Sequence, residues 1–226
     1  MLPGFASGIR IGGVVVSLPP ADLTVASTFI SVSNEANPKT LSAQAIGEYA
    51  SNRRTILSIQ WRNSSTRTLD TVTVGGASAA RLARASGASV NKNAEIWSLD
   101  TGVGTALEGL STANIVLTAS GANNAYTVTV YRALGVDQAG SGTATDATDP
   151  VSMSVTVPAG GAAVAVAANG STSSASLDVV TEALNAVCSS ATRGIHGYIV
   201  ASGSLTTTLS GTVSAPLGCA VAFAPN

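Results

Sequence analysis

The stretch YTVTVY at residues 126–131 decides the fold class of this 226-residue chain. Its period is two, so Tyr126, Val128 and Val130 point to one face of an extended strand and the residues between them to the other. One face is expected to be core, and the other can be wet. Residues 151–157 repeat the alternation, with Val and Met against Ser and Thr. This pattern is typical of antiparallel sheets with one solvated side.

Strand signals recur along almost the whole chain, as short runs of β-branched and aromatic residues between Gly, Pro and Asn clusters. The clearest predicted strands are 23–32, 55–61, 71–74, 95–99, 114–118, 126–134, 151–157, 162–167, 195–200, 205–209 and 219–223. Two stretches could be helical, 34–51 and 177–187, although neither has a full amphipathic stripe. The absence of a βαβ rhythm predicts an all-β, antiparallel β-sandwich or jelly-roll-like fold with less than about 15% helix.

Turn signals agree with this fold class. Asn169-Gly170 can supply the positive φ angles of a type I′ hairpin, and Gly75-Gly76 is a further breakpoint. The best linker candidate is 137–150, which has no strand pattern.

The linker bears on domain organisation, because it either separates two small sandwiches or crosses between the sheets of one. We expect an extended N-terminal arm over 1–21 and a single β-sandwich domain over 22–226, since the residues after Pro150 would form a marginal core alone. The alternative is two small sandwiches split near 137–150.

Charged residues make up only 10% of the chain, far below the usual ~25%. The surface must therefore be covered largely by Ser, Thr, Asn, Gly and Ala. The formal net charge of −1 gives no global field to attract nucleic acid or an anionic membrane. No window of about 20 apolar residues occurs, so we expect no membrane insertion.

Residues that could carry chemistry are few. His196 is the only histidine, no G-x-S-x-G motif exists, and a turn or surface position is expected for it. Asp137, Asp146 and Asp149 share one apparent loop, where aspartate usually forms turns, and a Ca²⁺ site is the less favoured alternative. Nucleotide-binding glycine loops are absent. We therefore expect no enzyme activity, no catalytic residues, no cofactor and no metal.

The two cysteines, Cys188 and Cys219, are too few for a zinc site. The favoured interpretation is two buried free thiols, with a disulfide bridge as the alternative.

Arginines cluster in one part of the chain, at Arg53, Arg54, Arg62, Arg67, Arg81 and Arg84. With only Trp61 among them, scattered surface and interface positions are expected, with some of them in protein contacts and no nucleic-acid groove. Trp61 and Trp97 are expected to be core anchors.

Residues 54–138 carry a set of packing motifs: RTILSIQW, VTVGG, EIWSL, NIVLT and YTVTVYRALGVDQ. Together they resemble β-sandwich proteins encoded among the structural genes of tailed bacteriophages and related gene-transfer particles. The resemblance covers about 40% of the chain. It implies a building block of a particle and carries no residue-level function.

The first functional hypothesis is therefore a non-enzymatic virion component, a tail-fibre, baseplate or head-spike subunit on an extracellular particle that contributes to host attachment. A neutral Ser/Thr/Asn exterior suits such an appendage. The alternatives are a capsid decoration (cement) protein and a carbohydrate-binding module. Expected partners are other virion proteins, further copies of this chain and a host surface glycan.

The N-terminal arm is the predicted contact segment. It mixes Gly and Pro with apolar residues, and Pro19-Pro20 disfavours helix and removes two backbone donors. We expect an irregular arm that docks on a partner subunit, although residues 11–18 could instead be the first strand of the sandwich. The expected partner-binding residues are Phe5, Ile9, Ile11, Val14, Val15 and Val16.

Overall fold

The computed structural model describes residues 8–11, 14–17, 19–31, 35–63, 67–86, 92–121, 124–137, 142–189, 192–200 and 203–226. These residues form antiparallel β-strands and no helix, so none of them belongs to a helix that could cross a bilayer. The prediction of an all-β antiparallel sandwich is confirmed. Jelly-roll-like connectivity stays a prediction.

Strands before residue 138 form two facing sheets. Sheet I contains, in order, β4 (Lys39–Ala45), β10 (Thr112–Ala119), β6 (Leu69–Val74) and β7 (Ala77–Ser78). Sheet II contains, in order, β3 (Asp22–Ile30), β11 (Ala125–Leu134), β5 (Arg53–Arg62), β9 (Lys92–Asp100) and β8 (Ala80–Ser86). The core between them is built on Trp61, Trp97 and Tyr126, so the tryptophans are core anchors as predicted.

Strands after residue 141 form a second pair of sheets. Sheet III contains, in order, β12 (Gly142–Asp146), β19 (Leu217–Phe223), β14 (Ala162–Asn169), β17 (Thr192–Val200) and β16 (Thr181–Ser189). Sheet IV contains β13 (Ser152–Val157), β18 (Gly203–Gly211) and β15 (Ala175–Leu177). Their shared core combines alanines, such as Ala163, Ala165 and Ala220, with aliphatic residues and Met153, and it contains no aromatic residue.

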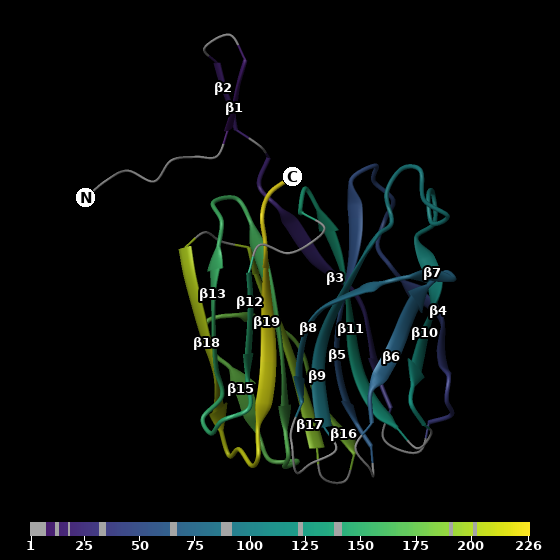
Figure 1. Ribbon diagram of the computed structural model, residues 1–226, viewed down its shortest axis with the longest axis vertical. Helices are drawn as coiled ribbons and strands as arrows, with labels where there is room; N and C mark the ends of the chain where they lie inside the picture. The colour runs from purple at the N-terminus through teal and green to yellow at the C-terminus, as the bar shows by residue number, and fades with distance from the viewer. Residues whose placement is uncertain are drawn as a thin grey trace, which may run out of the picture.

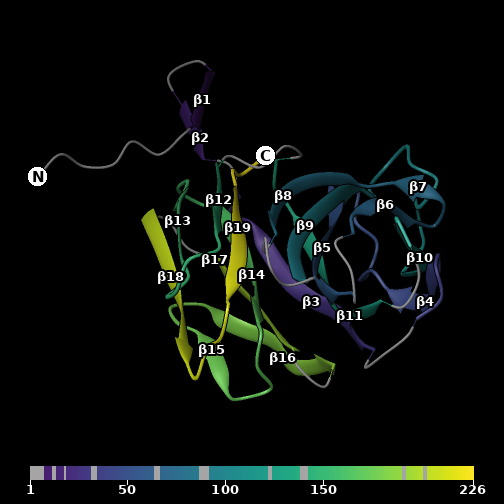
Figure 2. The same cartoon turned by 60° about the horizontal axis from the view of Figure 1, so that its bottom comes forward.

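Sheets II and III also pack face to face, so the two sandwiches lie side by side (Figures 1 and 2). A third core fills this contact, with Ile56, Tyr131, Val164 and Phe223 among its buried members. Sheets II and III are therefore covered on both faces. The single-domain organisation, with two small sandwiches split near 137–150 as its alternative, stays a prediction.

The two alternating stretches behave differently in this arrangement. Ser152, Ser154 and Thr156 on β13 are exposed, as the pattern predicted. On β11, however, Thr127 and Thr129 are fully buried, so the expectation that this face can be wet is wrong. The reason is sheet III, which covers the threonine face of β11.

Several local predictions are also wrong. The two helical candidates contain strands, β4 within 34–51 and most of β16 within 177–187. The expected linker contains β12, which pairs with β19. Asn169-Gly170 closes no hairpin, because β14 pairs with β17 and β19. The ladders of β4, β12 and β14 come from segments distant in sequence, whereas β16 pairs with β17, the next strand along the chain.

Candidate functional site

The N-terminal arm contains a two-stranded hairpin that stands apart from the four sheets. β1 (Gly8–Ile11) pairs with β2 (Val14–Ser17), and no other described strand joins this ladder. Figure 1 shows the hairpin beyond the ends of the sandwich strands, near the C-terminus. The expectation of an irregular segment is therefore wrong, since the chain forms a regular ladder here. The hairpin is equally no part of the sandwich sheets.

Five of the six predicted contact residues lie in this hairpin. The ladder sets Ile9 opposite Val16, Ile11 opposite Val14, and Val15 opposite Arg10. Phe5 lies outside the described residues. The structure thus brings most of the predicted contact residues together in one small element.

A shallow hollow of about 510 Å³ lies on the outer side of sheet I, where the 101–111 loop meets β10. Its lining is Ala43, Gly75, Gly76, Ala106, Leu107, Leu110, Thr112, Ala113, Asn114 and Val116, with no charged residue. Gly75 and Gly76 both have positive φ, 57° and 87°, as the tight turn between β6 and β7 requires. The hollow is thus a neutral surface of mixed polar and apolar character.

Arg53 holds the loop beside this hollow. The fully buried guanidinium donates hydrogen bonds to the carbonyls of Gly47 (2.8 Å), Leu107 (3.0 Å) and Thr101 (3.0 Å). Its Nη1 also donates to the Leu110 carbonyl, and its Nε to the Thr101 hydroxyl. Because one planar guanidinium binds carbonyls at Thr101, Leu107 and Leu110, it holds the 101–111 loop in place.

His196 sits between the two sandwiches and is fully buried. Its Nδ1 lies 2.7 Å from Ser58 Oγ and its Nε2 lies 2.8 Å from Thr127 Oγ1. Burial lowers the pKa of the imidazole to about 3, so it is neutral at physiological pH. The predicted turn or surface position is wrong. The Ser–His pair resembles a nucleophile and base, but a substrate has no access to it, and the ring is held by a threonine instead of a carboxylate.

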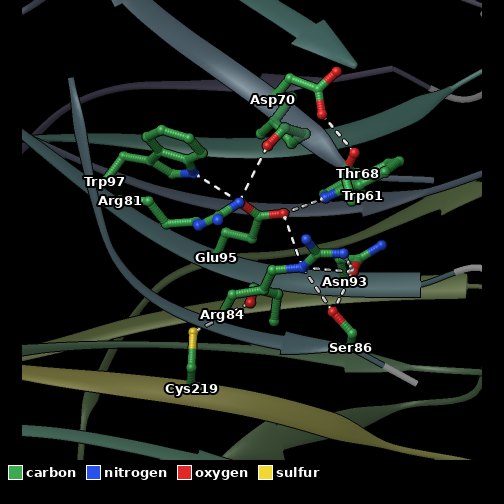
Figure 3. A network of polar contacts seen from close by, with 12 residues as sticks. Trp61, Thr68, Asp70, Arg81, Arg84, Ser86, Asn93, Glu95, Trp97 and Cys219 are labelled. Carbon is green, nitrogen blue, oxygen red and sulfur yellow. Dashed lines mark hydrogen bonds and ion pairs between the residues drawn. The ribbon is translucent and has the colours of Figure 1, made fainter. Parts of the chain in front are cut away.

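Glu95 is a second fully buried polar side chain, and it lies in the core between sheets I and II (Figure 3). The indole nitrogens of Trp61 and Trp97 each donate to its carboxylate at 3.0 Å. Arg81 and Arg84 approach within 3.9 and 3.7 Å. Burial raises the pKa of Glu95, and the indole and guanidinium groups partly oppose that shift. This network ties β5, β8 and β9 together and leaves the carboxylate no free face for a ligand.

Lys92 forms a third buried polar contact, at the seam between the sandwiches. Its ammonium group donates to the Ala215 carbonyl and lies 3.5 Å from the Ser214 carbonyl. Burial, with a smaller contribution from Arg62, lowers the pKa of Lys92 to about 8. The lysine thus fastens the start of β9 to the loop before β19.

Asp146, one of the three aspartates of the calcium alternative, binds backbone amides. Asp146 accepts hydrogen bonds from the Ser152 and Thr148 amides, both at 2.8 Å. Burial opposes its ionisation, yet these hydrogen bonds bring the net pKa of Asp146 below its usual range. Across the described ranges, no three His, Cys, Asp or Glu side chains gather as metal ligands.

Cys188 and Cys219 are buried free thiols, as favoured. They lie on β16 and β19, which β14 and β17 separate in sheet III. Strands are about 4.8 Å apart, so the two Cα atoms are too far apart for a disulfide. Burial raises the pKa of Cys188 to about 11, which leaves the thiol unreactive.

Sequence reasoning missed three of these features, namely the Arg53 clamp, the Glu95 network and the Lys92 contact. The expectation of scattered surface arginines is wrong for Arg53 and Arg54, which are buried. A signal existed for Glu95, because it occupies an inward position in the apolar run AEIWSL beside a tryptophan. The hollow left no local signal, since its lining comes from four separate segments.

Comparisons with protein-family models, with curated proteins and with solved structures find no match to this chain. The functional argument therefore depends on the hairpin, the hollow and the sealed polar groups.

Proposed function

We propose that this chain is a non-enzymatic structural subunit of a phage-like virion, displayed on the particle and attached through its N-terminal hairpin. The single observation that carries the proposal is the isolation of β1–β2 from every other described sheet. An isolated two-stranded hairpin is at best marginally stable in water. Its apolar residues, Ile9, Ile11 and Val14 to Val16, would be stabilised by burial against a partner.

The exterior of sheet IV supports an exposed position. Its strands β13, β15 and β18 contain no charged residue, and Ser154, Thr156 and Thr206 are exposed along them. A neutral hydroxyl surface hydrates well and offers little electrostatic attraction to unrelated molecules. Such a surface suits an appendage that meets a host surface.

The buried polar groups support a structural role over catalysis. Ser58, His196 and Glu95 have the chemistry of a nucleophile, a base and an acid, yet each is buried and hydrogen-bonded within the protein. Their hydrogen bonds connect neighbouring strands and sheets. Opening any of them to a substrate would require separating packed sheets.

Within this class, the isolated hairpin and the neutral exterior suit an attachment subunit and a capsid decoration protein equally. A carbohydrate-binding module is less well supported, because sugar platforms need exposed aromatic rings. Trp61, Trp97, Tyr126 and Tyr131 are buried, and Tyr49 is the most exposed aromatic side chain of the described residues, at 36%. Tyr49 also lies 3.3 Å from the Glu108 carboxylate.

The test is incorporation into particles. Full-length protein is expected to co-purify with particles in fixed copy number, whereas a chain lacking residues 2–18 stays folded in solution and is absent from particles. Arg10→Ser is the matched control, because it removes the only charge of the hairpin and keeps its apolar residues. Imaging then separates the two roles: shell lattice points indicate decoration, and the tail tip indicates attachment.

Two outcomes contradict the proposal. If the truncated chain unfolds in isolation, the hairpin belongs to its own core. If the full-length protein is absent from particles, the virion role is wrong.

A further inference from the structure

Most edges of the four sheets are closed to further strand pairing. An exposed edge presents unpaired N–H and C=O groups, and bulges, charges or very short strands usually block it. The ladders of β3, β4, β8 and β16 each contain a register shift. β7 and β15 are only two and three residues long, and β12 ends at the charged Asp146. Each of these edges thus carries a feature that hinders an additional strand.

β13 is the remaining edge, and it has none of these features. Its six residues, SMSVTV, include no charged residue and no proline, and all six pair with β18 without a register shift. Pro150 and Pro158 flank the strand, which limits the open edge to this segment. Sheet IV lies on the side of the molecule away from sheet I (Figures 1 and 2). In the described part of the chain, β13 is therefore the one regular, uncharged edge of the four sheets.

Hydrogen bonds at the start of β13 show which backbone groups face the free edge. Thr208, which lies opposite Ser152, is bound on the far side of β18, where its carbonyl accepts from the Asp178 amide at 3.2 Å and its amide donates to the Asp178 carboxylate. Ser152 and Thr208 therefore form a non-hydrogen-bonded pair, and the backbone groups of Ser152 point away from β18. The Ser152 amide is bound there by the Asp146 carboxylate at 2.8 Å. Every second residue of β13 has this outward direction.

Ser154 and Thr156 are the next residues with this direction, and their backbone groups have no such partner. Both residues are exposed, and no hydrogen bond in the described part of the chain involves their N–H or C=O groups. An additional strand can therefore form four hydrogen bonds here without breaking one. Because the Asp146 carboxylate occupies the Ser152 amide, the open edge begins after Ser152.

We propose that β13 of a second copy pairs with this edge, so that sheet IV continues across a two-fold axis into the same sheet of its partner. An antiparallel pair centred on Val155 sets Ser154 opposite Thr156 of the second copy, and Thr156 opposite its Ser154. This register uses all four open groups of each edge and leaves the contact between Ser152 and Asp146 in place. The contact is isologous and closes after two copies.

The two faces of β13 explain why a second copy fits this edge. Its Met and Val residues point into the core, and its Ser and Thr residues point outward. In the proposed register, residues opposite each other lie on the same face, so apolar side chains meet apolar ones and hydroxyls meet hydroxyls. The chain already contains such a hydroxyl pair, since Ser154 Oγ lies 3.0 Å from Thr206 Oγ1 on β18. Cross-strand pairs of this kind stabilise a sheet.

This contact is separate from the proposed hairpin attachment, because it lies on the C-terminal sandwich. A dimer of this kind leaves the outward hydroxyl face of sheet IV uncovered and doubles its extent. If the dimer is wrong, the role of the hairpin is unaffected, since the particle test depends on residues 2–18.

The experiment measures self-association of the full-length protein by sedimentation across a range of concentrations, together with amide hydrogen exchange. The unmodified chain should form a dimer that dissociates on dilution, since one pair of short strands makes a small interface. The amides of Ser154 and Thr156 should exchange at least ~10-fold more slowly in the dimer than in the monomer. The Ser152 amide, which is already bonded, is the internal reference and should change less.

Ser154→Pro tests the backbone contact directly. The fold tolerates proline at an edge position whose N–H faces solvent, but the ring removes one donor and obstructs the incoming strand. Dimerisation should weaken at least ~10-fold. Ser154→Ala is the matched control, because it removes the hydroxyl and keeps the N–H, and its dimerisation should stay within ~3-fold of the unmodified chain.

A pair of charges gives a second test that does not depend on proline. Ser154→Lys/Thr156→Lys places two lysines on the edge, and repulsion across the two-fold axis should weaken dimerisation at least ~10-fold. Thr206→Lys/Ser210→Lys is the matched control, because both residues are exposed on the central strand β18 of the same sheet. It adds the same charge away from the edge and should leave dimerisation within ~3-fold. Thermal melts check that each variant is folded.

Three results would overturn the proposed dimer. The unmodified chain could stay monomeric at the highest concentration reached. A dimer could form in which the amides of Ser154 and Thr156 exchange as fast as in the monomer, which would place the contact elsewhere. Finally, the folded edge variants could dimerise as strongly as their controls.

Discussion

The central strands of the two sandwiches, β5 and β14, are buried almost throughout and are built differently. β5 (RRTILSIQWR) carries Trp61, Gln60 and the clamp residue Arg53. β14 (AAVAVAAN) has no side chain larger than valine until Asn169 at its end. Large side chains bury more apolar area per residue, and their polar atoms fix register through hydrogen bonds. The N-terminal sandwich therefore has more stabilising contacts per strand.

The basic residues are also distributed unequally between the two sandwiches. Of the eleven Lys and Arg residues, only Arg193 lies beyond residue 137. The two contacts at the seam that involve a charged group are donated from the N-terminal side, by Lys92 to the Ala215 carbonyl and by Arg62 to the Ser189 hydroxyl at 2.9 Å. The cover at the seam is mutual, since sheets II and III each bury one face of the other, so the asymmetry rests on the side chains of the two separate cores. The comparison indicates an asymmetric dependence of the second sandwich on the first.

The largest expected effect comes from separating the halves. A chain of residues 19–137 should unfold cooperatively on its own, because its aromatic core between sheets I and II is complete. A chain of residues 142–226 should lack a fixed fold alone, since a small core is marginal and the core between sheets III and IV contains no aromatic side chain. Dispersion of NMR amide signals measures this, and mixing the two chains should restore it. A well-dispersed spectrum from 142–226 alone would show two independent domains.

The next effect compares one substitution in each half. Glu95→Ala leaves the indole N–H groups of Trp61 and Trp97 without an acceptor and should cost about 2–5 kcal/mol of unfolding free energy. Val166→Ala in sheet III removes only apolar contacts and should cost about 1–2 kcal/mol. Denaturant unfolding measures both. Glu95→Gln, which keeps one acceptor oxygen, is the control and should lie between them. Equal costs for Glu95→Ala and Val166→Ala would contradict the asymmetry.

Most strand positions could be predicted from sequence, because alternation and β-branched runs are local signals. Every predicted strand from 23–32 to 219–223 overlaps an observed one. The strands that were missed, such as β4 and β16, lie at sheet edges, where few positions are buried and the alternation is weak. β4 takes its extended form through a ladder to the distant β10, and β16 through a ladder to β17, the next strand along the chain.

The site was predictable only in its hairpin residues. Apolar residues beside Gly and Pro marked Ile9, Ile11 and Val14 to Val16 as a contact segment, although not as a ladder. The burial of Thr127 and His196 was not predictable, because it arises only when sheets II and III pack together. A threonine facing water and a threonine facing a buried imidazole have the same local pattern.

The seam between the sandwiches should be sensitive to acid through His196. Burial lowers the folded-state pKa to about 3, while the unfolded value is near 6.5. Between these values the unfolded state binds more protons, so stability falls as the pH falls from about 6.5 toward 3. The loss should reach about 2 kcal/mol by pH 5. His196→Gln should remove this slope, as measured by denaturant unfolding at several pH values. Identical acid profiles for the two proteins would show that His196 is accessible to protons in the fold.

The smallest expected effect is on the alkaline side, through Lys92. Its pKa is lowered to about 8, so between pH 8 and 10.5 the unfolded state holds the proton that the folded state has lost. Stability should therefore rise with pH across this range, with a slope below about 1.4 kcal/mol per pH unit for one proton. Other lysines and tyrosines also titrate here, so the measured quantity is the difference in unfolding free energy from Lys92→Met.

Arg62→Gln sharpens the test: removing the neighbouring positive charge should bring the pKa of Lys92 back toward its usual value and reduce the slope. A difference that stays flat from pH 8 to 10.5 would mean that Lys92 remains charged at the seam. The cation that joins the two sandwiches at neutral pH would then persist through this range, and its contact with the backbone carbonyls would offset the cost of its burial.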